Sequence, residues 1–140
     1  MINGKLYTEI LEEFQTATTK QDRLAVLKKY DTKTFREFLF YALEPTVEFD
    51  VEVPNYRPAV EPAGLNYSYL DLEVKKMYRF IKDHKLRQPG LTSEKQKRLL
   101  VVVLESLYKD EAELLAKVLQ KKFKIPNLTI KLVQEAYPGM

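Results

Sequence analysis

Residues 92–123, TSEKQKRLLVVVLESLYKDEAELLAKVLQKKF, contain the pattern that decides the fold of this chain. Apolar residues recur there every three or four positions, which is the spacing of one face of an α-helix. Thr92 or Ser93 can cap the first helix, and Asp110, three residues before Glu113, can cap a second in the same way. The stretch therefore predicts two consecutive helices with inward positions Leu99, Val102, Val103, Leu107, Leu114, Leu115, Val118, Leu119 and Phe123.

The same spacing predicts three short helices upstream, within residues 6–43. The first ends before Thr18, which together with Thr19 can cap the second. Asp31 or Thr32 can cap the third, and the Glu44-Pro45 pair disfavours its continuation.

Two further helices are expected around the central pattern. One covers residues 70–81, where Leu70, Val74, Met77, Phe80 and Ile81 supply the apolar positions. The other is short and begins after Thr129, which can cap it. Asn127 can adopt a left-handed conformation in the turn that precedes it, because asparagine tolerates positive φ better than most residues.

A long loop is expected between the third and fourth helices, over residues 44–68. Its four prolines lack a backbone N–H and have a fixed φ, which disfavours a regular helix or a central strand. VEFDVEV, residues 47–53, alternates apolar and acidic side chains, but a strand there has no obvious partner. The sequence therefore predicts an all-α, single compact domain over residues 1–140, with six or seven helices and a long Pro-rich acidic loop.

Composition excludes several classes of protein. The chain has 140 residues, no cysteine and one histidine, so a disulfide framework, a thiolate metal site and a histidine cluster are all impossible. Glu48, Asp50 and Glu52 lack the glycine and terminal glutamate of a calcium-binding EF-hand loop, so no metal is expected. No apolar run is long enough to span a membrane, and a cytoplasmic protein without cofactors is expected.

Charge is distributed unevenly along the chain although its net value is only +3. Residues 44–73 carry seven acidic side chains against one basic, whereas residues 74–131 carry fifteen basic against six acidic. Since Lys and Arg clusters attract phosphates, the basic half is the candidate anion-binding surface.

Helix starts within and near this half are candidate phosphate sites, because a helix N-terminus presents unpaired N–H groups and a partial positive charge. Each such residue also has a structural alternative, since threonine and serine cap their own helices and lysines fill solvated helix ends. The candidate DNA-binding residues are Lys20, Thr92, Ser93, Lys95, Lys121, Lys122, Lys124, Asn127, Thr129 and Lys131.

Two segments resemble one known family in their order and spacing. Residues 10–30, ILEEFQTATTKQDRLAVLKKY, continued by residues 35–42, resemble the start of the N-terminal DNA-binding domain of T-even-type phage ATP-dependent DNA ligases. Residues 110–140, DEAELLAKVLQKKFKIPNLTIKLVQEAYPGM, preceded by Leu91-Thr92-Ser93, resemble the end of that domain. The resemblance implies a helical domain that grips double-stranded DNA, nicked or intact, along its backbone and minor groove.

The chain also departs from that family. Pro126-Asn127 stands where the family has a glycine turn, and lysine or alanine replaces several charged residues of its sixth helix, at Ala116, Lys117, Lys121 and Lys122. No Lys-x-Asp-Gly motif occurs, so the covalent adenylate that ligation needs cannot form on such a lysine. The chain ends about where the family's nucleotidyltransferase domain would begin, and we expect it not to be an enzyme.

The leading hypothesis is a non-catalytic phage accessory protein that binds duplex DNA in the host cytoplasm. The alternative is a protein-interaction adaptor, whose acidic loop engages a phage or host replication protein through Glu48, Asp50, Glu52, Tyr56, Tyr67 and Tyr69. A third hypothesis is one piece of a split ligase that works with a separate catalytic chain. No membrane and no small-molecule substrate is expected as a partner.

Overall fold

Seven α-helices and one 3-10 helix make up the regular structure of residues 1–139, which the computed structural model describes. They are α1 (Tyr7–Thr16), α2 (Lys20–Lys29), α3 (Lys33–Leu43), α4 (Leu70–Glu73), η1 (Val74–Phe80), α5 (Ser93–Ser106), α6 (Lys109–Leu119) and α7 (Ile130–Ala136). Those residues contain no β-strand, only two isolated bridges. The predicted all-α class is confirmed.

Four predicted threonine caps are present, and each hydroxyl accepts a hydrogen bond from the N–H three residues later. Thr19 and Thr32 accept from Asp22 and Phe35, both at 3.1 Å. Thr92 accepts from Lys95 at 3.3 Å, and Thr129 accepts from Leu132 at 3.1 Å. The prediction for Asn127 is also confirmed, since its φ is +67°.

The start of α6 differs from the prediction. Asp110 does not cap this helix, which begins one residue earlier at Lys109 with Tyr108 as its N-cap and no side-chain cap bond. The reason is the short connection, since only Leu107 and Tyr108 separate α5 from α6. Glu113 pairs with Lys117 at 3.2 Å instead of completing a capping box.

The inward face of α5 is rotated from the predicted one. Val102 was expected in the core but is 67% exposed, whereas Leu100 and Leu104 are fully buried. Gln96 is also buried, because its side-chain amide donates to the Arg79 carbonyl at 2.9 Å. A run of apolar residues at every position from 99 to 104 does not by itself define which face turns inward.

Residues 74–80 form a 3-10 helix where an α-helix was predicted. The buried side chains of this segment are Val74, Met77 and Phe80, which are three residues apart. A 3-10 helix has three residues per turn, so it places all three on one line, whereas an α-helix would rotate them apart. The core contact therefore selects the tighter winding.

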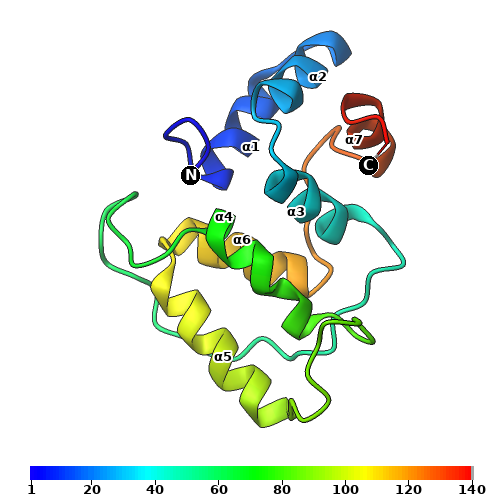
Figure 1. The fold of residues 1–140 in the computed structure, drawn as a ribbon. Helices are drawn as coiled ribbons and strands as arrows, with labels where there is room; N and C mark the ends of the chain where they lie inside the picture. Colours follow the sequence, from blue (N-terminus) through cyan, green and yellow to red (C-terminus); the bar gives the residue numbers. More distant parts are fainter. Residues whose placement is uncertain (140) are drawn as a thin grey trace.

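Figure 1 shows α1 and α2 at one end of the molecule and α5 at the other. The middle is formed by α3, which packs on α6, α7 and η1, and by α6, which also packs on α1, α4 and α5. Tyr7, the first residue of α1, packs against Phe35 and Phe38 of α3, with its ring centroid 5.0 and 4.9 Å from theirs. One continuous core therefore joins both ends.

No helix within residues 1–139 has the length and apolar character needed to cross a bilayer.

A buried carboxylate supplies the caps that two helices lack. The N-cap residues of α1 and α4 are Leu6 and Tyr69, neither of which makes a side-chain cap bond. Glu111 of α6 is 1% exposed and accepts from the Tyr7 N–H at 3.2 Å and from the Leu70 N–H at 3.0 Å. Burial raises the pKa of its carboxyl, while the two backbone hydrogen bonds oppose that shift. One side chain thus ties three helices together.

Replacing Glu111 with alanine should lower the free energy of unfolding by about 3 kcal/mol, because two buried N–H groups would lose their acceptor. Urea titration followed by circular dichroism measures this difference. The matched control is Glu113→Ala on the same helix, which removes an exposed carboxylate and should change stability by less than about 0.5 kcal/mol. Equal effects of the two substitutions would contradict the role given to Glu111.

Candidate nucleic-acid interface

An open hollow of about 310 Å³ lies between the start of α2 and the start of α7. We call it the α2–α7 hollow. Its lining residues are Lys20, Arg23, Asn127, Thr129, Lys131, Leu132 and Glu135. Four of them were candidate DNA-binding residues in the sequence, and they come from segments more than a hundred positions apart.

Three cationic side chains and one carboxylate face this hollow. The Lys20 ammonium lies 3.0 Å from a carboxylate oxygen of Glu135, in an exposed ion pair that water and salt can readily separate. The Arg23 guanidinium donates to the Thr18 carbonyl at a long 3.5 Å, and Lys131 makes no ion pair within residues 1–139. Positive charge is therefore in excess here and available to an anion.

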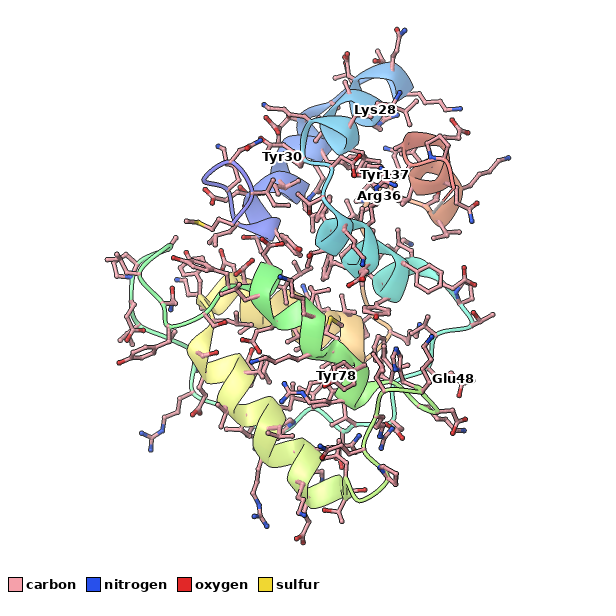
Figure 2. The ribbon with its side chains drawn as sticks, viewed as in Figure 1. Lys28, Tyr30, Arg36, Glu48, Tyr78 and Tyr137 are labelled. Carbon is pink, nitrogen blue, oxygen red and sulfur yellow. The ribbon has the colours of Figure 1, made fainter. Side chains whose placement is uncertain are left out.

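The walls of the α2–α7 hollow are held together by contacts of Tyr137, the residue that follows α7. Tyr137, which is fully buried, donates its hydroxyl to the Leu27 carbonyl at 2.5 Å and so attaches α7 to α2. Arg36 of α3 and Tyr137 lie next to each other in Figure 2. The Arg36 guanidinium is 4.7 Å from the centre of the Tyr137 ring, and it also donates to Asp31 at 2.6 and 2.7 Å. Burial raises the pKa of Tyr137, so its hydroxyl stays protonated.

Lys122 and Lys124 line a different hollow, between α1 and α6. Its rim is mixed in charge, because Glu12, Asp110 and Glu113 also face it. The two hollows adjoin successive parts of one connection, residues 120–129, which leads from α6 to α7.

Lys121 has a structural position. Its φ is +58°, and the N–H groups of Lys121 and Lys122 donate to the carbonyls of Val118 and Lys117 at 3.1 and 2.8 Å, which is the Schellman arrangement at a helix end. Its ammonium donates to the Glu44 carbonyl at 3.3 Å and lies over the Phe49 ring. Burial lowers the pKa of this ammonium.

Glycine at position 121 should give a protein about 1 kcal/mol more stable than alanine there, because only glycine adopts positive φ without strain. Both variants lose the lysine contacts, so the difference between their free energies of unfolding reports only the backbone strain at position 121. Thermal unfolding measures this difference. At Lys122, whose φ is not positive, alanine should be at least as stable as glycine. If glycine were more stable than alanine at both positions, or less stable at both, this explanation would be contradicted.

Thr92, Ser93 and Lys95 lie at the start of α5, at the end of the molecule opposite α2 (Figure 1). The Thr92 hydroxyl is already used as a cap. The structure therefore divides the candidate DNA-binding residues among four places, and the largest group, four residues, lines the α2–α7 hollow.

The acidic side chains of the loop form ion pairs with basic residues at positions 82–97 of the same chain. Glu48 pairs with Lys82 at 3.7 Å, Asp50 with Arg87 at 2.5 Å, and Glu52 with Lys97 at 3.1 Å. Instead of a strand, one bridge forms, in which the Asp50 N–H donates to the Phe80 carbonyl and the Lys82 N–H to the Glu48 carbonyl, at 3.1 and 2.8 Å. In the described chain no group of three or more histidine or carboxylate side chains could hold a metal ion.

The three candidate tyrosines of the loop have different environments. Tyr56 is half-buried against the core, and the Tyr69 hydroxyl donates to the Gly64 carbonyl at 3.0 Å. Tyr67 is 93% exposed, and Val60 and Leu65 of the same loop are also exposed, at 92% and 71%. We call these three residues the apolar tip.

Two charged lining residues of the α2–α7 hollow, Arg23 and Glu135, were missed in the sequence. Arg23 follows Lys20 by three positions on α2, a helical spacing that places them on one face. Glu135 follows Lys131 by four positions on α7 in the same way. Helical periodicity could have grouped each pair, but not shown that the two helices adjoin.

Residues 10–125 match the model of a family of unknown function, DUF6433. No curated protein and no solved structure matches the chain.

Proposed function

Since the chain belongs to DUF6433, a family of unknown function, we propose a function from the site itself: the protein binds the backbone of duplex DNA at the α2–α7 hollow. In this proposal it is a non-catalytic phage accessory protein, similar to the N-terminal domain of T-even-type phage DNA ligases. The convergence of Lys20, Arg23 and Lys131 on one open hollow is the observation that supports it most.

The chemistry of the hollow suits a phosphodiester. Ammonium and guanidinium groups donate charge-assisted hydrogen bonds to phosphate oxygens, and such contacts position a protein on DNA without reading its sequence. A bound phosphate would take the place of the Glu135 carboxylate beside Lys20. Lys122 and Lys124 line the separate hollow between α1 and α6, so the proposed contact does not depend on them.

Fluorescence anisotropy with intact, nicked and single-stranded DNA tests the proposal. The triple variant Lys20→Ala, Arg23→Ala, Lys131→Ala should bind duplex at least about tenfold more weakly, and its slope of log affinity against log salt should fall by up to about three, near 0.9 per lost phosphate contact. The control, Lys75→Ala, Lys76→Ala, Arg98→Ala, removes as much exposed charge elsewhere and should have a much smaller effect.

Equal losses in both triple variants would show that only total charge matters and would contradict this site. Absence of duplex binding by the unchanged protein, even at low salt, would contradict the proposed function altogether.

A protein-interaction adaptor is the second candidate, favoured by the exposure of the apolar tip. Glu48, Asp50 and Glu52 already form ion pairs with basic residues of the same chain. The apolar tip is therefore the part of the loop that a phage or host protein would contact. Large apolar side chains that are exposed in the free protein gain burial when a partner covers them.

The adaptor function predicts that Val60→Ser, Leu65→Ser, Tyr67→Ser abolishes binding to a purified replication protein while duplex binding is unchanged. Calorimetric titration against individual purified proteins measures this. Val102→Ser, an exposed apolar position on α5, is the control. Unaltered binding by the triple variant would exclude the tip as the contact.

A further inference from the structure

A second hollow, of about 610 Å³, lies beside α3 and has an aromatic and apolar lining. We call it the α3 hollow. Phe40 and Tyr41 of α3 form one side, and Val47 with Ile81 forms the other. Phe40 is 39% exposed, which is unusual for so large an apolar side chain, whereas Val47 and Ile81 are buried. A hollow of this size and character can hold a small planar ring.

The charged groups of the α3 hollow lie on the α3 side. Lys33, Arg36 and Glu37 occupy the same face of the helix as Phe40, which they precede by seven, four and three residues. Arg36 is held by Asp31, and Lys33 makes no ion pair among the described residues. Lys33 is therefore the unpaired cation on this face, about two helical turns from Phe40, and the two side chains suit a ligand with a flat uncharged ring and an attached phosphate.

The α3 hollow and the α2–α7 hollow adjoin opposite ends of α7. Lys131, in the first turn of α7, lines the α2–α7 hollow, and Gly139, just beyond the end of α7, lines the α3 hollow. A helix of seven residues is about 10 Å long. That length corresponds to roughly three nucleotides along one duplex strand.

We infer that the α3 hollow receives the base of one unpaired nucleotide, from a DNA whose backbone lies at the α2–α7 hollow. The inference rests on the proposed function and adds a preference for DNA with an unpaired base. A paired base has both faces stacked in the duplex, whereas an unpaired base can stack on Phe40 while its phosphate meets Lys33.

The test compares a blunt DNA hairpin with the same hairpin carrying one unpaired 2-aminopurine, as a 5′ or as a 3′ overhang. The protein should bind one overhang at least about fivefold more tightly than the blunt hairpin, the effect of stacking one base on an aromatic ring. Fluorescence of 2-aminopurine should fall on binding, because stacking quenches it.

Phe40→Ala should remove both the preference and the quenching and leave affinity for the blunt hairpin unchanged. Phe40→Leu keeps an apolar side chain and should behave in the same way, which separates stacking from any loss of folding. Val102→Ala is the control at an exposed apolar position on α5 and should change nothing.

Equal affinity for blunt and overhanging DNA, without quenching, would overturn the role of the α3 hollow and leave duplex binding intact. No binding to either DNA would overturn the proposed function as well. If Phe40→Ala instead changes the sedimentation of the free protein, a second copy of the chain occupies the hollow, and the inference is wrong.

Discussion

The carboxylate of Glu111 is the interaction on which the arrangement of the helices most depends. It lies inside the core and accepts the N–H groups at the starts of α1 and α4, two helices whose own N-cap residues offer no acceptor. A buried charge is costly unless its hydrogen bonds are satisfied, so this side chain is compatible with only one placement of both helix ends. The placement of α1 in turn brings Tyr7 against the phenylalanines of α3.

Charge has a similar organising role at the surface. The acidic loop is neutralised by basic residues that follow it in the sequence. Three ion pairs join it to Lys82 and Arg87, which lie between η1 and α5, and to Lys97 of α5. Each exposed pair contributes little alone, but together with the backbone bridge at Phe49 they define the path of a segment without helix or strand. The cations that remain for an external anion are therefore fewer than the sequence suggests.

The candidate interface is formed around α7. Tyr137 and Arg36 attach this helix to α2 and α3, and a hollow adjoins each end of it: a cationic one beside α2 and an aromatic one beside α3. Lys20, Lys131 and Lys33 of the two hollows are exposed, whereas Tyr137, which holds α7, is fully buried. This division lets the surface residues change without moving the helix.

Much of the local structure could be predicted from the sequence, because it depends on neighbouring residues. Thr19, Thr32, Thr92 and Thr129 cap helices through bonds to residues three positions away, and Asn127 forms its turn by its own backbone preference. Features that depend on distant residues could not be predicted: the winding of residues 74–80, the inward face of α5, and the role of Glu111, which resembled one more acid in a first turn. The same holds for the candidate site. The sequence by itself determined which residues carry charge and where most helices begin. Only the tertiary structure decided that Lys20, Arg23 and Lys131 meet while Lys95 lies at the far end of the molecule, because packing brings α7 against α2.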